Sequence, residues 1–600
     1  MSRLHEVFND FSGVFDAKLR SHRTVSRTST SRSEQITVTS RVALLEAKFD
    51  LAVLDRMHEP SFVGIERRVS SGSTPIYLIY EVTGVRPTHF QMLAMDTSLP
   101  TVIRKEYLDT IYQGWGKSEE TWVDVACVPT GYKMTVNSNG EPSFSRTGLF
   151  PLVGAPAHFL SDYAVKRLLC TEKGDPLGTL LGFGLPLTVD LEGLVKYHAG
   201  VFGFTGSGKS NLTAQLIRNI ISKAPDSTVV VFDVAGEYAI HLADILSQEG
   251  KLFTTETFAD AESLVDSQSL PETLEGGVSG EKLVHWAQRL MDQGRVNKIV
   301  FERTQPVFTL NFLLDLLNVY VQEKKTGAVQ AASVYQRVMD EVAGKMHAEL
   351  DTPLQDLEDD AKSGLAQLLE EALSKLNDRS SLYGDLASFV DHLTRTLSED
   401  SNIQDETRNG YATSKDLVKL SLEENSPKLV VVHAPEPVGA RVFAADYITA
   451  LLNAKKHGAR RRVLVVLDEA QEYIPYNTRK DDFTEWSSRA VEALLRQGRK
   501  YRAHCWLATQ RVAHLNTNAL QQLHSYFVST MPRYYDRMVV ADAFSLNYEV
   551  LEHTTQLETG QWLFVSYKAT KQKNVPVFIQ APDNEEHLRK WFNSGSNLAL

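Results

Sequence analysis

The chain has 600 residues, of which 42% are hydrophobic and 23% are charged, and its formal net charge is −12. This length allows several domains, and the composition is that of an ordinary globular protein able to bury a core. The negative charge excludes a chain that binds nucleic acid over its whole surface. Any contact with nucleic acid therefore requires a local basic surface.

Three cysteines, Cys127, Cys170 and Cys505, lie far apart and form no C-x-x-C pair. Neither a disulfide framework nor a zinc ribbon is expected. Charged residues interrupt the N-terminal stretch MSRLHEVFNDFSGVF, which excludes a signal peptide, and no stretch reaches the roughly 20 apolar residues of a membrane span. We expect a soluble, cytoplasmic protein with no membrane contact.

The N-terminal third divides into two predicted regions. Residues 1–34 are predicted to form an arm, because the stretch from 16 to 41 is rich in Ser, Thr and Arg. A mobile polar segment is favoured there, and docking on a partner is the alternative. Residues 35–185 hold β-branched and aromatic clusters between turn residues, such as TPIYLIYEVTGV (74–85). This pattern predicts a small β-barrel or sandwich.

An α/β pattern begins near residue 186. Apolar strands such as HAGVFGF (198–204) and STVVVFDVAGEY (227–238) are typical of a parallel sheet covered on both faces. We assign 186–254 and 427–600 to the two parts of an ATPase core, the second ending in a pair of C-terminal strands. Residues 255–426 are acidic, with apolar residues at helical spacing, and are predicted to be an inserted helical bundle.

The stretch GFTGSGKS (203–210) has the spacing of a phosphate-binding loop, G-x-x-x-x-G-K-S. Small residues turn backbone N–H groups toward phosphates, and the helix that follows adds its positive end. Lys209 is expected to reach the β- and γ-phosphates of ATP, and Ser210 to bind Mg²⁺. The expected nucleotide-binding residues are Gly203, Thr205, Gly206, Ser207, Gly208, Lys209, Ser210 and Asn211.

Acidic and polar residues follow three other predicted strands. Asp468 ends VLVVLDEA and is expected to hold Mg²⁺, while Glu469 is expected to polarise the attacking water. Gln510 ends HCWLATQ and is expected to face the γ-phosphate. Asp233 and Glu237, in FDVAGEY, are placed near the metal or the water, with a turn- or helix-capping carboxylate as the alternative.

Arginines surround the strand that bears Gln510. Arg489, Arg496 and Arg499 precede it and Arg511 follows it. A cation that neutralises the γ-phosphate accelerates phosphoryl transfer, and it often comes from a neighbouring subunit. Arg499 is preferred for this role, followed by Arg496 and Arg511, and a solvent-facing arginine is the alternative for each.

Together these motifs resemble the HerA branch of the HerA/FtsK ATPases. The resemblance rests on five stretches in a shared order: HAGVFGFTGSGKS (198–210), DVAGEY (233–238), DEAQ (468–471), GRKY (498–501) and TQR (509–511). It covers essentially the whole chain, strongly at these motifs and loosely elsewhere. The fold expected is therefore α/β, a RecA-like P-loop ATPase core with an inserted helical bundle, preceded by a small N-terminal β-barrel.

The resemblance implies a homohexameric ring that hydrolyses ATP at subunit interfaces and moves along double-stranded DNA. It also implies a partner that docks on the N-terminal barrel, either a nuclease in DNA end processing or an effector such as a sirtuin-like NAD hydrolase in anti-phage defence. One position departs from the family. An arginine often precedes the histidine of the phosphate-loop strand, but here Tyr197 stands before His198, and Lys196 is the nearest substitute cation.

The most basic run, KKHGARRR (455–462), is expected at the sheet edge opposite the nucleotide. A solvated loop is favoured for it, and a contact with a DNA channel or partner is the alternative. Duplex translocation needs phosphate contacts rather than base readout. Two other functions stay open: a conjugation-type DNA pump at a membrane, and a nucleotide-gated scaffold ring that assembles and activates an effector, with weak or partner-dependent ATPase.

Overall fold

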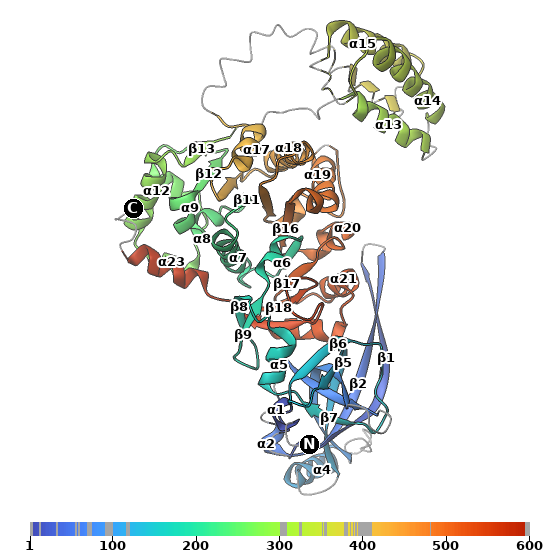
Figure 1. Cartoon of the computed structure of the whole chain (residues 1–600), viewed down its shortest axis with the longest axis vertical. Helices are drawn as coiled ribbons and strands as arrows, with labels where there is room; N and C mark the ends of the chain where they lie inside the picture. Colours follow the sequence, from blue (N-terminus) through green and yellow to red (C-terminus); the bar gives the residue numbers. More distant parts are fainter. Residues whose placement is uncertain are drawn as a thin grey trace. The chain divides into compact units, whose positions relative to one another are not determined.

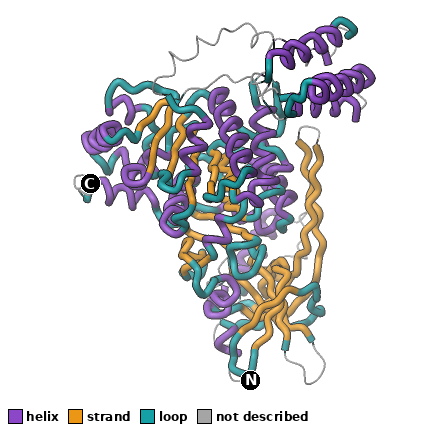
Figure 2. Tube along the Cα trace, turned by 45° about the horizontal axis from the view of Figure 1, so that its top comes forward, coloured by secondary structure: helices purple, strands orange, loops and turns teal. Residues whose placement is uncertain are grey.

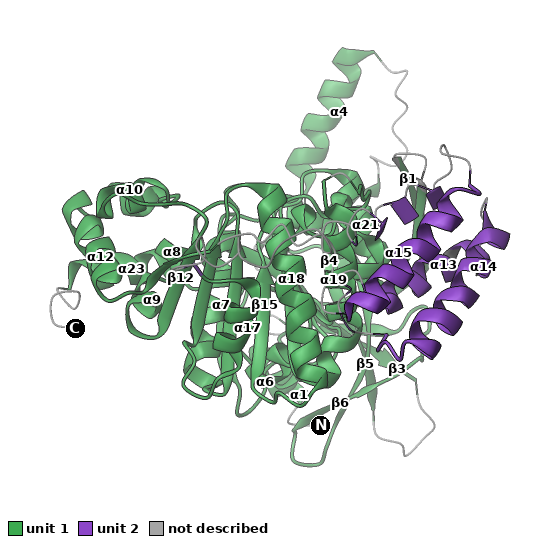
Figure 3. Ribbon diagram, turned by 90° about the horizontal axis from the view of Figure 1, so that it is seen from above, with its two compact units in different colours: residues 1–299, 412–600 green, residues 300–411 purple. Residues whose placement is uncertain are grey.

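The computed structural model divides the chain into two compact units, residues 1–299 with 412–600 and residues 300–411 (Figure 3). The residues it describes are 4–10, 14–31, 34–54, 57, 60–68, 75–90, 100–115, 120–299, 309–322, 327–350, 352, 354, 357–376, 382–383, 386–387, 389–390, 393, 411–480 and 482–594. Along this part of the chain, no helix combines the length and apolar character needed to cross a membrane.

A twelve-stranded sheet organises the larger unit (Figure 1). Its order is β13-β12-β14-β11-β15-β16-β10-β17-β18-β19-β8-β9. The first eight strands are parallel and the last four pair antiparallel. In chain order the strands are β8 (Asp175–Leu180), β9 (Pro186–Val189), β10 (Ala199–Phe202), β11 (Ser227–Asp233), β12 (Gly250–Thr254), β13 (Val296–Lys298), β14 (Leu429–His433), β15 (Arg462–Leu467), β16 (Ala503–Thr509), β17 (Ser525–Val528), β18 (Gln561–Ser566) and β19 (Val577–Gln580).

The central strands are buried because they carry continuous apolar runs rather than alternating ones. Every residue of β10, β11, β14, β15 and β16 is buried. The helices that cover or flank this sheet include α6 (Leu191–Val195), α7 (Lys209–Lys223), α18 (Pro437–Lys456), α19 (Thr484–Gln497), α21 (Tyr534–Phe544) and α23 (Asn584–Asn593). The end of the chain, predicted only as strands, therefore also contributes helix α23.

A second, seven-stranded sheet occupies the N-terminal region, in the order β2-β1-β7-β3-β4-β5-β6. Pairing between β2 and β5 closes six of its strands on themselves. One face packs inward, including Leu45, Val63 and Tyr80, while Tyr77 and Ile79 on the other face join the large core of the ATPase part. The strands are β1 (Ala17–Ser31), β2 (Glu34–Lys48), β3 (Ser61–Arg67), β4 (Ile76–His89), β5 (Thr121–Val136), β6 (Pro142–Arg146) and β7 (Pro156–Phe159).

The mobile arm predicted over residues 1–34 is wrong over residues 17–31. Residues 17–31 form β1, which pairs with β2 along a long hairpin, drawn as two long orange strands in Figure 2. Polar β-branched residues sustain this pairing, because Thr28 and Thr37 face each other across it with hydroxyls 3.1 Å apart. Arg27 then anchors the hairpin to the ATPase part through an ion pair with Glu549.

Two predicted domain boundaries also shift. The β region expected to end at 185 ends earlier, because β8 pairs with β19 and so belongs to the large sheet. The insertion expected over 255–426 is shorter, because the separate unit spans 300–411. Helices α10 (Ala261–Asp266) and α12 (Gly280–Asp292) place Leu264 and Trp286 in the core of the larger unit.

The smaller unit is helical in its described residues and has a core of its own. Its helices are α13 (Leu310–Gln322), α14 (Ala328–Arg337), the π-helix η2 (Val338–Lys345) and α15 (Asp359–Leu373). Leu313, Val334 and Leu365, which come from α13, α14 and α15, are buried together in this core.

Candidate nucleotide-binding site

The phosphate-loop pattern lies where β10 ends and α7 begins. Gly206 and Gly208 have φ values of 81° and 88°, a left-handed conformation that glycine adopts without strain. The Ser207 N–H donates to the Phe204 carbonyl (3.1 Å), which tightens the turn. The loop therefore reverses direction at the carboxyl edge of the parallel sheet and presents the first turn of α7.

Lys209 opens α7 with its side chain turned into the protein. Its Nζ lies 2.5 Å from Oδ1 of Asp468 and 2.9 Å from Oε1 of Glu469. Burial alone would lower the pKa of Lys209, but the two carboxylates outweigh it and raise the pKa. The ammonium group is thus held charged beside the acids that end β15.

Asp468 is fully buried directly after β15, and two features of its surroundings shift its pKa in opposite directions. Burial raises its pKa and Lys209 opposes the rise. Its Oδ1 accepts from Lys209, whereas Oδ2 is buried with no hydrogen-bond partner among the described residues. A buried carboxylate oxygen with a free acceptor position suits a cation or its bound water.

Glu469 is held by three donors. Besides Lys209, its Oε1 accepts from Nε2 of Gln510 (2.8 Å), and its Oε2 accepts from Nε2 of Gln471 (2.9 Å). Its backbone has φ 48°, an uncommon value for a residue with a side chain. Burial would raise the pKa of Glu469, but Lys209 and these amides lower it, so the carboxylate stays ionised.

Further hydrogen bonds extend this network in both directions. Thr509 Oγ1 donates to Oε1 of Gln471 (2.5 Å), and Thr205 Oγ1 donates to Oε1 of Gln510 (2.6 Å). Gln471 and Thr509 belong to the DEAQ and TQR motifs, but the sequence alone assigns neither a role. Their positions could have indicated a role in the site, because each lies within two residues of an expected site residue at the end of a buried strand.

Asp233 and Glu237 have different places in the site. Both carboxylate oxygens of Asp233 accept backbone N–H groups, from Gly236 and from Tyr238, each at 2.8 Å. Asp233 thus shapes the loop after β11, as the capping alternative expected. Burial, followed by the charge of Asp468, raises its pKa to about 7. Glu237 is the acid that contacts the phosphate-loop helix, accepting from Ser210 Oγ.

Asn211 faces another part of the chain than expected. Its Nδ2 donates to the Pro582 carbonyl (3.2 Å), and its Oδ1 accepts from the N–H groups of Asn584 (2.9 Å) and Glu585 (3.2 Å). All the polar atoms of this side chain therefore bind the C-terminal segment before α23. This geometry argues for a tether rather than the predicted nucleotide contact.

Of the four arginines, Arg499 and Arg511 lie at opposite edges of the sheet. Arg489 and Arg496 lie on α19 and pair with Glu485 and Glu492, and Arg499 follows in the short helix η5 (Gly498–Tyr501). Arg511 lies at the carboxyl edge, directly after Gln510, and is exposed. Arg499 precedes β16 and Gln510 follows it, so the seven residues of that strand separate them by about 20 Å.

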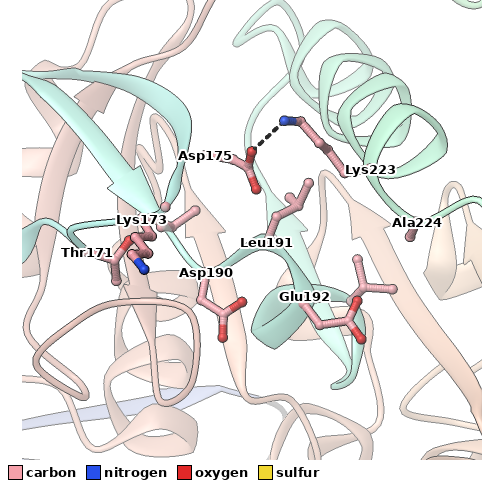
Figure 4. Close-up of a pocket in the computed structure, with 11 residues that line it drawn as sticks. Thr171, Lys173, Asp175, Asp190, Leu191, Glu192, Lys223 and Ala224 are labelled. Atoms are coloured by element: carbon pink, nitrogen blue, oxygen red, sulfur yellow. Dashed lines mark ion pairs between the residues drawn. The ribbon is translucent and has the colours of Figure 1, made fainter.

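A cavity of about 450 Å³ lies away from these groups (Figure 4). Its lining includes Asp175 and Lys223, whose side chains pair at 3.0 Å, and Glu192. Lys223 ends the helix that Lys209 begins, and 15 helical residues span about 22 Å. The cavity is therefore separate from the phosphate loop.

Residues 175–433 match the family described as helicase HerA, central domain. A curated relative, the DNA double-strand break repair helicase HerA of Pyrococcus furiosus, is 22% identical over 436 residues, which cover 66% of this chain and 68% of the relative. Residues 175–433 are therefore those of a HerA-like ATPase. The Lys209, Asp468 and Glu469 cluster is the part of this HerA-like ATPase with the chemistry for nucleotide hydrolysis.

Two solved structures are similar in fold to this HerA-like ATPase. VirB4 of Thermoanaerobacter pseudethanolicus has a TM-score of 0.38 and 14% identity, with 70% of this chain and 100% of that chain covered. The plasmid coupling protein TrwB, solved in complex with ADP and Mg²⁺, has a TM-score of 0.35 and 13% identity, with 71% and 92% covered.

Proposed function

We propose that this HerA-like ATPase is an ATP-driven translocase on double-stranded DNA that works as a homohexameric ring. The observation that carries the proposal is the meeting of Lys209, Asp468 and Glu469 at one sheet edge, beside Ser210 and Gln510. The relative from Pyrococcus furiosus is named as a DNA repair helicase, which supports DNA as the substrate.

The side chains suit phosphoryl transfer to water. Lys209 exchanges its two carboxylate partners for phosphate oxygens when a nucleotide occupies the loop, since both are anions within reach of its Nζ. Glu469, held ionised, then accepts a proton from the attacking water. Gln510 contacts both Glu469 and Thr205, so it links the base to the phosphate loop.

The residues fit a magnesium ion bound with the nucleotide. Asp468 offers its unpartnered Oδ2, and the hydroxyl of Ser210 lies beside Glu237. The described residues contain no cluster of three or more His, Cys, Asp or Glu side chains suited to a metal. Magnesium commonly takes one or two protein ligands and completes its shell with phosphates and water. When bound, it neutralises charge on the phosphates.

Two surface features support the proposed hexameric ring and its partner. A γ-phosphate cation from a neighbouring copy fits the position of Arg499, which is about 20 Å from Gln510 of its own subunit. The closed N-terminal sheet offers a separate surface for a nuclease or an NAD-hydrolase effector. Exposed apolar side chains there include Leu152 and Val153, at 53% and 66% exposure.

One experiment tests the proposal in parts. ATP hydrolysis of the purified protein is measured with and without linear duplex DNA, and its mass is read by light scattering, with Lys209→Ala as the inactive control. A hexamer stimulated by DNA supports a translocase. A ring with weak turnover and no response to DNA contradicts the translocase and favours a nucleotide-gated scaffold that assembles an effector.

A further inference from the structure

Two cations lie against one tyrosine ring at the edge of the large sheet opposite the phosphate loop. The guanidinium carbon of Arg499 is 5.4 Å from the centroid of the Tyr197 ring, and Nζ of Lys568 is 5.1 Å from it. The ring of His524 lies 4.8 Å from the same centroid. We call Tyr197, Arg499, Lys568 and His524 the tyrosine cluster.

Strand directions explain why these four residues meet. Tyr197, Arg499 and His524 each lie shortly before a parallel strand, namely β10, β16 and β17. Lys568 lies just after β18, which runs antiparallel to β17 and so ends at the same edge. The phosphate loop, Asp468 and Gln510 all follow parallel strands and lie at the other edge. The tyrosine cluster therefore faces away from the nucleotide of its own subunit.

Neither cation of the tyrosine cluster forms an ion pair among the described residues, although acids neutralise other cations nearby. Lys196 pairs with Glu192 at 3.1 Å, and Arg462 pairs with the same carboxylate at 2.8 Å. Lys196 is therefore engaged, and Lys568 is the second cation on the tyrosine that stands where the family often has arginine. Arg499 and Lys568 are both exposed.

The basic run at 455–462 has less free charge than the sequence suggests. Lys455 is buried and donates to the Arg461 carbonyl, and Arg461 donates to the hydroxyl of Thr228 (2.9 Å) and to the Glu424 carbonyl (3.1 Å). Arg462 is buried against Glu192. Three basic residues of this run therefore stabilise the fold, while Lys456 and Arg460 are exposed. The tyrosine cluster differs from them because it holds two cations against one aromatic ring.

The pKa of His524 reflects the positive charge around it. Burial lowers its pKa, and Arg499 and Lys568 lower it further. Two exposed cations against one tyrosine ring, neither paired with an acid among the described residues, gain when an anion binds beside them. Stacking on an aromatic face also orders both side chains before any ligand arrives.

We propose that Arg499 and Lys568, held on Tyr197, form a binding site for phosphate groups that come from outside the subunit's own nucleotide site. Two sources share this chemistry: the nucleotide of a neighbouring copy in the ring, and the backbone of duplex DNA. The inference rests on the proposed function, since both sources belong to it. It adds Lys568 as a phosphate-contacting residue.

The test uses Lys568→Gln in the full-length protein, which removes the charge from an exposed side chain. The matched control is Lys590→Gln on α23, an exposed lysine paired with Glu586. Two quantities are measured: steady-state ATP turnover together with ATP affinity, and binding of a 30-base-pair duplex of random sequence across a salt series.

Each source gives its own signature. If the phosphates belong to a neighbouring nucleotide, Lys568→Gln lowers kcat at least ten-fold while ATP affinity and duplex affinity stay unchanged. If they belong to DNA, duplex affinity falls and the slope of log K against log salt becomes shallower by about 0.9, the value of one phosphate contact. Tyr197→Phe keeps the aromatic ring and should behave like the wild type, whereas Tyr197→Leu should show part of the loss seen in Lys568→Gln.

Wild-type turnover and wild-type duplex binding in Lys568→Gln would overturn the inference. That result is distinct from failure of the proposed function, in which the wild-type protein itself neither hydrolyses ATP nor binds the duplex. A loss of equal size in Lys590→Gln would also overturn it, because the effect would then follow net charge rather than the tyrosine cluster.

Discussion

Lys209 and Asp468 are 259 positions apart in the sequence, yet their side chains meet at 2.5 Å in the protein interior. The contact joins the phosphate loop to the end of β15, and Glu469 makes it a three-residue cluster. An amine buried between two carboxylates keeps its charge, as the raised pKa of Lys209 shows. The cluster therefore brings the cation proposed to bind phosphate, the acid proposed to bind metal and the proposed base within reach of one ligand.

Removing either end of this cluster is expected to abolish ATP turnover. Lys209→Ala loses the phosphate contact, so ATP affinity falls together with turnover. Glu469→Gln keeps the shape but loses the base, so kcat falls by roughly 10²–10⁴-fold while nucleotide still binds. Turnover is measured by phosphate release and affinity by titration of a fluorescent ATP analogue.

A matched control lies on the same helix. Lys223 ends α7, has 61% of its side chain exposed and pairs with Asp175. Lys223→Ala should leave turnover close to that of the wild type, because an exposed ion pair contributes little. Wild-type rates in either site variant would refute the assignment.

Gln471 is expected to act as a positioning residue for Glu469. It donates to Oε2 of that carboxylate and accepts from Thr509 Oγ1, so it fixes one rotamer of the base. Gln471→Ala should lower kcat about ten-fold or more with little change in ATP affinity, since misplaced bases cost rate rather than binding. A change confined to ATP affinity would contradict a positioning role.

Thr509→Ser serves as the conservative partner in this experiment. It keeps the hydroxyl that Gln471 accepts, so kcat should stay near the wild-type value, whereas Thr509→Val should follow Gln471→Ala. Equal losses in Ser and Val would show that packing of the threonine methyl group, and not the hydrogen bond, sustains the rate.

Strand positions in the ATPase core could be predicted because local sequence determines them. The stretches chosen for β10, β11 and β15 are continuous apolar runs that end at a glycine or an acid, and the structure has strands there. Such runs bury both faces of a strand whatever surrounds them. Because the carboxyl ends of parallel strands meet at one edge of a sheet, the sequence also predicts that Asp468 and Gln510 lie at the same edge.

Side-chain partners could not be predicted, because they depend on elements distant in sequence. Asn211 lies next to the phosphate loop, but Pro582 and Asn584 take its polar atoms. The β1–β2 hairpin was missed because Ser, Thr and Arg suggest a solvated segment. Its strand conformation depends on cross-strand pairing and on packing against α21 and α22 (Tyr548–Glu552).

Acid should destabilise the protein through histidines that are buried. Nδ1 of His198 accepts from the Cys505 N–H at 3.0 Å, and burial, followed by the nearby His524, lowers its pKa from 6.5 to about 4. Burial lowers the pKa of His241 and of His433 to about 4 as well. Between these values the unfolded chain binds protons that the folded chain does not.

The stabilising contribution is therefore complete above pH 6.5 and is lost as pH falls toward 4. Each such histidine lowers the free energy of unfolding by about 1.4 kcal/mol per pH unit in this window. Tm should fall from pH 6.5 to 4.5, and less steeply in His198→Asn, while the exposed His457→Asn keeps the wild-type slope. Identical slopes in all three proteins would refute the role of His198.

Arg27 is expected to hold the N-terminal hairpin on the ATPase part. Its guanidinium pairs with Glu549 and lies 4.7 Å from the centroid of the Tyr548 ring. Arg27→Ala leaves the buried Glu549 without its partner, which costs on the order of 1–3 kcal/mol. Limited proteolysis should then cut within residues 17–48 several-fold faster. Arg23→Ala, an exposed position on the same strand, is the control, and equal cleavage rates in the two variants would count against the anchor.

Mixed rings should reveal whether Arg499 acts on a neighbouring copy. Arg499→Ala and Lys209→Ala are each expected to be inactive alone, since one lacks the cation and the other the phosphate loop. In a mixture, an intact Lys209 site can face an intact Arg499 of the next subunit, which restores roughly a quarter of the interfaces at equal amounts. Phosphate release is measured after subunit exchange.

The geometry favours recovery in that experiment. Arg499 lies at the amino edge of the sheet, about 20 Å from Gln510 of its own subunit, so its guanidinium cannot reach its own γ-phosphate without a large rearrangement. A mixture that stays inactive after confirmed exchange would place Arg499 in cis, and Arg511, next to Gln510 at the carboxyl edge, would become the better candidate for the cation.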